Sequence, residues 1–310
     1  MRLLFAGTPD TAVPALEALL ASDHEVVAVL TRPDARAGRG RALAPSPVKD
    51  VALAHRISVL TPTSTRDDTL RSTLVDLDLE AAAIVAYGGL IPPALLSAPT
   101  HGWINLHFSV LPAWRGAAPV QRAIMAGDTV TGASTFVLEE GLDTGPVLGT
   151  MTEAIRADDT AGTLLDRLAR AGAGLLVATL DGLAEGVLHA TPQPLDGVSL
   201  APKLTVAQAE VPWHRPGYAV DRHIRGCTPA PGAWTLFRGQ RLGIGPVRLL
   251  GTDEASLTPG LLLADKRSVI VGTGSGPVAL DVVTPPGKRA MAAADWARGV
   301  RIDIGERFGQ

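Results

Sequence analysis

The chain has a single cysteine, Cys227, among its 310 residues. One cysteine cannot form a disulfide within the chain and cannot build a cysteine cage around a metal ion. The histidines follow no H-x-x-x-H or comparable spacing, so we predict no metal site. We interpret Cys227 as a small buried apolar residue rather than as a nucleophile.

Long apolar runs are missing as well. Glycine, proline or a charged residue interrupts every apolar stretch well before the ~18 residues that a membrane span requires. The opening residues, MRLLFAGTPD, are typical of a buried strand and its turn, because their apolar run is too short for a signal peptide. We therefore expect a cytoplasmic protein that does not enter a membrane. Separately, we expect the protein to be a monomer.

Charge is unevenly distributed along the chain, although the net charge is only −3. Residues 1–206 carry 15 basic and 22 acidic groups, whereas residues 207–310 carry 13 basic and 9 acidic groups. A mildly basic tail on an acidic protein points toward a polyanionic partner, but the charge of the tail alone is weak evidence for one. Apolar residues make up 46% of the chain, which is ample for one large domain or two ordinary ones.

Short apolar runs alternate with helical patterns in the first half of the chain. The runs that predict buried strands are Leu3–Ala6, Glu25–Leu30, Arg56–Leu60, Glu80–Tyr87 and Trp103–His107. Such strands, separated by helices, indicate a parallel sheet that is covered on both faces. The alternating runs Ala133–Leu138 and Val147–Ile155 then predict an antiparallel addition, and Asp159–Leu183 predicts one long helix.

The second half follows another pattern. Three prolines and a glycine between Pro192 and Pro202 are typical of a linker. Beyond it, short apolar runs punctuated by glycine and proline favour a small all-β barrel or sandwich. We therefore predict an α/β domain over residues 1–190, a linker over 191–206 and a β domain over 207–310.

A basic loop stands out in the acidic first domain. Thr31–Lys49 contains one acid, Asp34, and five basic residues: Arg32, Arg36, Arg39, Arg41 and Lys49. Its glycines and prolines oppose regular structure, so we interpret it as a flexible arm for phosphates or, alternatively, as a solvated surface loop. A second basic pair, Lys288 and Arg289, precedes Trp296 and fits either an RNA-binding patch or a plain exposed turn.

Three polar residues form a candidate catalytic set. Asn105 and His107 alternate along one predicted strand, so their side chains point to the same face. Asparagine can donate a hydrogen bond to an oxyanion, and histidine can move a proton near neutral pH. Asp143 lies in a glycine-flanked turn that suits a carboxylate presented in a cleft, or one that caps its own turn. Spacing alone does not bring the three together.

The motifs around these residues resemble those of the folate-dependent formyltransferases. N-L-H-x-S-V-L-P-x-W-R-G-A-A-P and E-E-G-L-D-T-G-P look like the catalytic signature of that superfamily. The loop R-P-D-x-x-x-G-R-G-x-x-x-x-P-S-P-V-K and the late G-K-R-A-M-x-x-x-D-W-A-R-G are similar to the methionyl-tRNA formyltransferase family. The resemblance covers essentially the whole chain.

The resemblance implies both a fold and an activity. It implies a Rossmann-like formyltransferase domain followed by an OB-like β-barrel that binds tRNA. It implies transfer of the formyl group of 10-formyltetrahydrofolate to the α-amino group of methionyl-initiator tRNA, without a metal. By the same resemblance Asn105, His107 and Asp143 are catalytic, and the folate site is lined by Ser109, Val110, Leu111 and Pro112.

Three positions depart from the family pattern. Ala113 stands where relatives often carry a basic residue, Phe108 replaces a small residue, and Leu200 replaces an aromatic one. None of them is one of the three catalytic positions. Two other functions remain open: a formyltransferase for an amino-sugar nucleotide, a small amine or water, and a non-catalytic RNA-binding protein.

Overall fold

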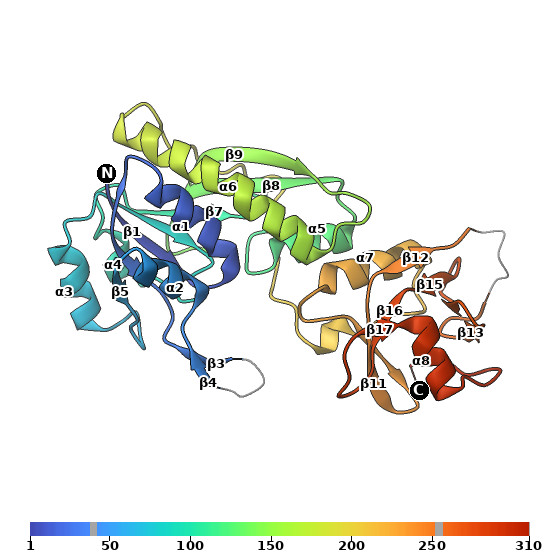
Figure 1. Cartoon of the computed structure of the whole chain (residues 1–310). Coiled ribbons are helices and arrows are strands. Elements are labelled where there is room, and N and C mark those ends of the chain that lie inside the picture. Colours follow the sequence, from blue (N-terminus) through green and yellow to red (C-terminus); the bar gives the residue numbers. More distant parts are fainter. Residues whose placement is uncertain (38–41, 252–256, 310) are drawn as a thin grey trace. The chain divides into compact units, whose positions relative to one another are not determined.

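The computed structural model describes residues 1–37, 42–251 and 257–309. The chain divides into two compact units (Figure 1). The first comprises Met1–Gly116, Val130–Ala154 and Leu165–Leu200, and the second comprises Ala117–Thr129, Ile155–Leu164 and Ala201–Gln310. Two short segments that precede the tail in the sequence, 117–129 and 155–164, therefore belong to the second unit. The domain limits near 190 and 207 stay a prediction.

A seven-stranded sheet in the order β5-β2-β1-β6-β7-β8-β9 forms the centre of the first unit. The parallel strands are β1 (Arg2–Gly7), β2 (Glu25–Leu30), β5 (Ser58–Leu60), β6 (Ala81–Val85) and β7 (Trp103–His107). The remaining strands, β8 (Val130–Val137) and β9 (Val147–Ala154), run antiparallel to their neighbours. The parallel sheet and its antiparallel addition, both predicted from the apolar runs, are confirmed.

Helices separate the strands of this sheet along the chain. Those of the first unit are α1 (Val13–Leu20), α2 (Pro47–Ala54), α3 (Asp68–Asp76) and α4 (Pro93–Leu96), and the long α6 (Ala161–Ala184) follows the last strand, β9. Strand β6 is buried along its whole length, because it lies in the interior of the sheet between β1 and β7. Strand β1 is equally buried from Leu3 onward, with Leu3, Leu4 and Phe5 at 0% exposure.

The chain places β2 and β5 on one side of β1 and then crosses over to place β6 and β7 on the other side. The sheet therefore has a topological switch point between β1 and β6. Ligands of open α/β sheets bind beyond the carboxyl ends of the strands at such a point. Here the loops that follow β1 and β6 are joined by a hydrogen bond, in which the Thr8 hydroxyl donates to the Tyr87 carbonyl at 2.8 Å.

The second unit contains two four-stranded antiparallel sheets. One has the order β10-β11-β16-β17 and the other β12-β15-β14-β13. The first consists of β10 (Trp234–Phe237), β11 (Gln240–Ile244), β16 (Val282–Thr284) and β17 (Met291–Ala292). The second consists of β12 (Val247–Leu249), β13 (Leu262–Ala264), β14 (Val269–Val271) and β15 (Val278–Leu280). The antiparallel β tail that the sequence predicts is confirmed.

Two helices accompany the strands of the tail, α7 (Gly217–Cys227) and α8 (Ala293–Val300), and the short apolar runs did not predict them. Helix α5 (Pro119–Ala126) belongs to the same unit although it precedes the tail in the chain. Helix α7 buries Val220, Ile224 and Cys227 on one face, a helical spacing that the sequence does carry. Helices α5 and α7 pack closely, since a Cβ on Gly226 would lie 3.0 Å from the Gln121 carbonyl oxygen.

The basic loop has more regular structure than the sequence predicts. Strands β3 (Ala35–Ala37) and β4 (Ala42–Ala44) pair as an antiparallel hairpin, and helix α2 begins at Pro47. Ser46 caps that helix by accepting a hydrogen bond from the Lys49 amide at 3.1 Å. The residues on either side of the loop's glycines form these strands, and Gly38 and Gly40 themselves lie outside the described residues.

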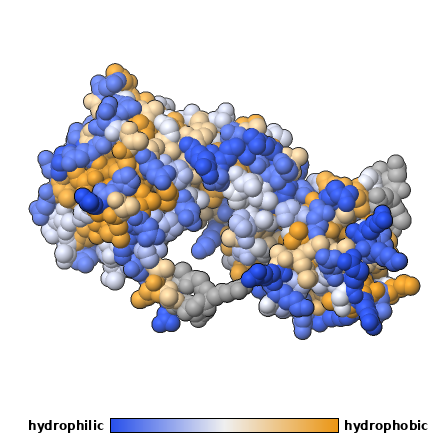
Figure 2. Space-filling model, in the orientation of Figure 1, coloured by the Kyte–Doolittle hydropathy of each residue, from blue (hydrophilic) through white to orange (hydrophobic). Residues whose placement is uncertain are grey.

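The surface mixes apolar and hydrophilic residues. On the face drawn in Figure 2, apolar (orange) and hydrophilic (blue) areas alternate over both units. Within the described residues, no helix is both long enough and apolar enough to cross a membrane.

Candidate active site

Two of the candidate catalytic residues lie on strand β7, beside the end of the antiparallel addition. Asn105 pairs with Ile84 of β6 and with Phe136 of β8, and His107 pairs with Ser134 of β8. The two-residue spacing places both side chains on one face of the sheet, as the sequence predicts. Asn105 is half-buried, whereas His107 is 7% exposed.

Both ring nitrogens of His107 face polar atoms of the protein. Nε2 lies 2.9 Å from the Trp114 carbonyl oxygen. Because a carbonyl oxygen only accepts, Nε2 carries the proton and donates it to Trp114. Nδ1 lies 3.6 Å from Oδ2 of Asp143, which is longer than a normal hydrogen bond. The neutral ring therefore presents its lone pair to the carboxylate.

The Asp143 carboxylate is fixed by its own turn and by the loop that follows β7. Its Oδ2 accepts a hydrogen bond from the Gly116 amide at 2.7 Å. Asp143 itself adopts a left-handed φ of 50°, which asparagine and aspartate tolerate better than most residues. Gly145 permits the tight turn, because a Cβ there would lie 1.8 Å from the Val137 carbonyl oxygen. The structure thus brings Asp143 to His107.

Burial and charge act on His107 in opposite directions. Burial lowers the pKa of His107 below its usual value because the imidazolium loses its hydration. The nearby Asp143 carboxylate and the hydrogen bond to Trp114 raise the pKa, but less than burial lowers it. The ring is therefore neutral at neutral pH, and Asp143 is the charge that favours its protonation.

The loop after His107 is held by its own hydrogen bonds. The buried Ser109 hydroxyl donates to the Ala113 carbonyl at 2.6 Å, and Ser134 donates to the Ser109 carbonyl at 2.8 Å. The Ser134 hydroxyl in turn accepts from the Leu111 amide at 3.1 Å. These bonds shape the segment in which the resemblance places the folate site: Ser109, Val110, Leu111 and Pro112. Phe108 is buried, so it acts through packing rather than at the surface.

A residue that the sequence analysis assigned to the linker contacts this site. The Gln193 side-chain amide donates to the carbonyl oxygens of Asp143 and Gly145 at 2.8 and 2.7 Å. Its Oε1 accepts two hydrogen bonds from the Arg115 guanidinium, at 3.0 and 2.7 Å. Gln193 therefore ties the Asp143 turn to the loop after β7.

Ser199 makes a second link from the same stretch of chain. Its hydroxyl accepts from the Trp114 amide at 2.8 Å, and its carbonyl accepts from the Arg115 amide at 2.9 Å. Trp114 has a left-handed φ of 61°, so these bonds hold the residue in a strained conformation that directs its carbonyl at His107. Polar residues among the prolines of the segment are the signal that could have revealed this role.

The predicted tRNA-binding residues lie in both units. Arg32 and Arg36 are exposed, while Arg39 and Arg41 lie outside the described residues. The Lys49 ammonium forms an ion pair of 2.6 Å with Asp34, so its charge is partly neutralised within the loop. Lys288 and Arg289 are exposed in the second unit, in the turn between β16 and β17.

Neither cysteine nor metal chemistry is supported in the described parts of the chain. Cys227 is fully buried, and burial raises the pKa of its thiol to about 11, so the thiol stays protonated. The expectation that it is a buried apolar residue is confirmed. No group of three or more potential metal ligands is found among the described residues.

The Rossmann-like sheet defines an α/β unit of the formyltransferase type, and comparison of the sequence with known families agrees. Residues 1–180 match the formyl transferase family, and residues 203–301 match the formyl transferase C-terminal domain. This chain belongs to the formyl transferase family.

Curated relatives match the chain over nearly its whole length. The methionyl-tRNA formyltransferase of Mycobacteroides abscessus is 58% identical over 303 residues, which cover 98% of each chain. That of Streptomyces coelicolor is 58% identical over 310 residues and covers 100% of each chain.

More distant solved structures share the fold. HypX from Aquifex aeolicus in complex with tetrahydrofolic acid aligns with a TM-score of 0.68 at 17% identity, covering 99% of this chain and 48% of HypX. The N-formyltransferase from Helicobacter canadensis in complex with folinic acid and dTDP-3-aminofucose aligns with a TM-score of 0.69 at 16% identity, covering 90% and 97%. At these identities the likeness concerns the fold alone.

Proposed function

We propose that this chain transfers the formyl group of 10-formyltetrahydrofolate to the α-amino group of methionyl-initiator tRNA. The observation that carries the proposal is the 58% identity to methionyl-tRNA formyltransferases across the entire chain, catalytic unit and tail included. We infer that the protein acts as a cytoplasmic monomer. The reaction needs no metal and no covalent intermediate on the enzyme.

The chemistry requires an oxyanion partner and a path for protons. When the amine attacks the formyl carbon, a tetrahedral oxyanion forms, the amine nitrogen loses a proton, and the leaving nitrogen gains one. The half-buried Asn105 amide supplies a hydrogen-bond donor for the oxyanion. His107 supplies a neutral imidazole whose Nδ1 can take a proton beside the Asp143 carboxylate.

His107 can reach a substrate atom only after a change of partner. Its Nε2–H is bonded to the Trp114 carbonyl, and its Nδ1 faces Asp143. A substrate oxygen or nitrogen that binds Nε2 must therefore replace the Trp114 carbonyl. We infer that this loop makes the required adjustment, because Trp114 has a left-handed φ of 61° and Gly116, with a φ of 123°, tolerates conformations that other residues avoid.

Separate parts of the chain hold the two substrates in this proposal. The folate lies against the loop of Ser109, Val110, Leu111 and Pro112, whose conformation the Ser109 and Ser134 hydroxyls fix. The tRNA phosphates bind the basic residues Arg32, Arg36, Arg39, Arg41 and Lys49 of the first unit and Lys288 and Arg289 of the tail. Arginine suits phosphate because its planar fork makes two parallel hydrogen bonds.

The test is a choice of acceptors. The purified protein is incubated with labelled 10-formyltetrahydrofolate and, in separate reactions, methionyl-initiator tRNA, uncharged tRNA, a nucleotide-linked amino sugar, or buffer alone. We expect label only on methionyl-initiator tRNA. Label on the amino sugar alone, or release of formate in buffer, would replace the proposed acceptor. Binding of tRNA with no transfer at all would favour a non-catalytic RNA-binding protein.

A further inference from the structure

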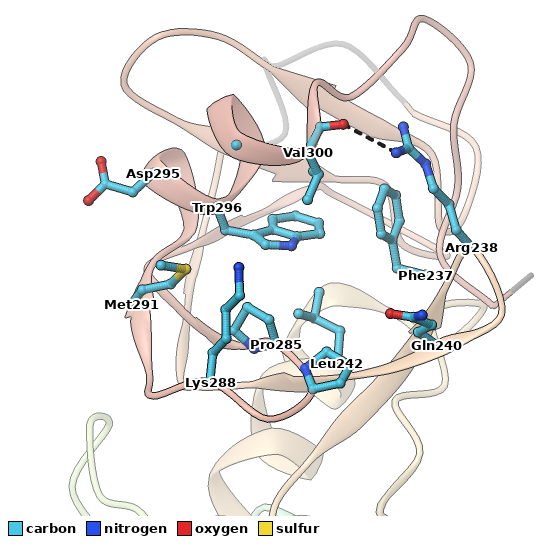
Figure 3. A pocket seen from close by; sticks show the side chains of 12 residues that line it. Phe237, Arg238, Gln240, Leu242, Pro285, Lys288, Met291, Asp295, Trp296 and Val300 are labelled. Atoms are coloured by element: carbon cyan, nitrogen blue, oxygen red, sulfur yellow. Dashed lines mark hydrogen bonds between the residues drawn. The ribbon is translucent and has the colours of Figure 1, made fainter.

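The tail contains a cavity with aromatic walls that the proposed active site does not use. Its volume is about 420 Å³, within the range of ~300–1,000 Å³ that is usual for small-molecule sites. Figure 3 shows the indole of Trp296 on one side of the space, with Leu242 and Pro285 opposite it and Phe237 at one end. Trp296 and Phe237 meet edge to face, with centroids 5.0 Å apart.

Two hydrogen-bond donors face this space. Figure 3 shows the indole nitrogen of Trp296 on the ring edge that is turned toward Leu242 and Pro285. The Lys288 ammonium also points into the cavity from the turn between β16 and β17. Donors beside flat apolar walls fit a planar ring that carries oxygen or nitrogen acceptors.

Charge at the rim is positive on balance. The Arg238 guanidinium is neutralised by Glu306, through contacts of 2.6 and 2.9 Å, and Asp295 is paired with Arg298. Among the described residues no ion pair neutralises the exposed Lys288. Its neighbour Arg289 is also exposed. The mouth of the aromatic cavity therefore carries exposed positive charge. Proteins bind single-stranded nucleic acids with this combination: the aromatic side chains stack on bases, and the cations contact phosphates.

We propose that this cavity receives one unpaired nucleobase of the RNA substrate, with the adjoining phosphates held by Lys288 and Arg289. The inference rests on the proposed function, because that function supplies an RNA as substrate. The base would lie against the Trp296 indole, and its acceptors would take hydrogen bonds from the indole N–H and the Lys288 ammonium. The cavity reads an exposed base rather than a sequence, since every base offers a flat face.

The first test fills the cavity. Met291 lines it and is half-buried, so Met291→Trp places an indole in the space that a base would occupy. Leu249→Trp is the matched control, because it adds the same ring at a position 50% exposed on β12. We expect Met291→Trp to raise the Kd of the full-length protein for short oligouridylate and oligoadenylate about tenfold. We expect the control to bind like the wild type.

The second test separates base from phosphate. Inorganic polyphosphate serves as a polyanion without bases, and its Kd should not change in Met291→Trp. Lys288→Gln should instead weaken both ligands and should flatten the salt dependence of RNA binding by ~0.7 in log–log slope. A Met291→Trp protein that lost polyphosphate binding equally would show damage to the charged surface and would overturn the base-pocket inference.

A third measurement does not depend on any variant folding. Oligoribonucleotide containing 5-bromouridine is photo-crosslinked to the wild-type protein, and the modified peptides are mapped by mass spectrometry. Crosslinks at Phe237, Met291 or Trp296 support the pocket. Crosslinks confined to other residues overturn it, and so does crosslinking that an apolar peptide suppresses but unlabelled RNA does not. Wild-type formylation of methionyl-tRNA together with such a negative result would leave the proposed function intact. Crosslinks in the cavity without formylation of methionyl-tRNA would instead contradict the proposed function.

Discussion

His107 is held between a backbone carbonyl and a carboxylate, and this arrangement determines its protonation. Burial keeps the ring neutral, and the hydrogen bond to Trp114 fixes the proton on Nε2. Nδ1 is left as the site that gains a proton, at 3.6 Å from Asp143. The neutral ring can gain a proton at Nδ1, whereas contact between Nε2 and a substrate atom requires that the Trp114 carbonyl be replaced.

The first prediction concerns the three proposed catalytic residues. Asn105→Ala, His107→Ala and Asp143→Ala should each lower kcat by ~10² or more, because each removes a donor, a proton carrier or its charged partner. Steady-state formylation of methionyl-tRNA measures the effect, and thermal unfolding confirms that the variants are folded. If His107→Ala turned over at the wild-type rate, His107 would have no part in the chemistry.

The second prediction concerns the pKa of His107. Asp143 stabilises the imidazolium and so raises this pKa, while burial lowers it. Asp143→Asn removes the negative charge, so the pKa of His107 should fall still further below its ordinary value. The imidazole resonance followed by NMR from neutral to acidic pH measures the change. A pKa that stayed constant or rose in Asp143→Asn would mean that the carboxylate does not act on His107 through its charge.

The third prediction concerns Gln193, which we expect to be a positioning residue. Gln193→Glu retains the acceptor for Arg115 but replaces the donor to Asp143 and Gly145 with a carboxylate oxygen that repels both carbonyls. The Asp143 turn should shift, and kcat should fall by ~10- to 100-fold.

Two measurements separate this role from general destabilisation. The KM for methionyl-tRNA should change little in Gln193→Glu, because the residue does not belong to the basic surfaces. Gln208→Glu serves as the control, since Gln208 is exposed and its Oε1 accepts from Thr205, a role that a carboxylate can keep. Equal losses in both variants would contradict a specific role for Gln193.

At the level of elements, the hairpin of β3 and β4 and the helix α2 organise the basic loop. The Thr31 and Ser46 hydroxyls are hydrogen-bonded at 2.7 Å, and the pair Lys49–Asp34 joins the start of the loop to α2. These contacts close the base of the hairpin, so its described arginines, Arg32 and Arg36, are presented from an ordered stem. Arg39 and Arg41 belong to the part of the loop outside the described residues.

The fourth prediction concerns the arginines of this loop. Changing Arg36, Arg39 and Arg41 to alanine should raise the KM for methionyl-tRNA, and each lost phosphate contact should reduce the log–log salt slope by ~0.7–0.9. The folate KM should be unchanged, because the proposed folate site is the loop after His107. Alanine at Arg66, Arg71 and Arg170 removes the same charge from exposed positions elsewhere in the unit. If the two triple variants behaved alike, the loop would be ordinary solvated surface.

At the level of the whole molecule, the division into units does not follow the order of the sequence. Helix α5 precedes strands β8 and β9 in the chain, yet it belongs to the unit of the tail and packs against α7. Conversely, the segment up to Leu200 belongs to the first unit, where Gln193 and Ser199 hold the loops of the proposed active site. A cut through the chain therefore affects both units.

The fifth prediction compares two C-terminal truncations. A fragment ending at Leu200 keeps Gln193 and Ser199, whereas a fragment ending at Thr191 loses both. The longer fragment should have the higher Tm. Its free energy of unfolding should be larger by ~1–3 kcal/mol, which is the cost of leaving a few buried polar groups unpaired in the shorter fragment. Both should bind tRNA poorly because the basic tail is gone. Equal Tm values would show that the segment 192–200 acts only as a linker.

Local patterns in the sequence were sufficient to predict the strands of the central sheet, the long helix and the candidate catalytic residues. Alternation along β7 places Asn105 and His107 on one face, and the glycines on either side of Asp143 predict a turn there. Both predictions succeed because side-chain alternation and turns depend only on residues close together in the sequence. The resemblance to formyltransferases then connected the motifs to a reaction. Helix α7 was missed even though its apolar spacing is visible, since glycine and proline around it favoured strands.

The tertiary structure alone decided which partners these residues have. The carbonyl of Trp114 on His107, the Gln193 amide on the Asp143 turn and the packing of α5 on α7 all join segments that local propensity treats as independent. Hydrogen-bond partners 50 residues apart, as Gln193 and Asp143 are, are selected by how the sheet and its loops pack. The sequence by itself determined the chemical groups of the site, and only the packed chain decided their protonation and their geometry.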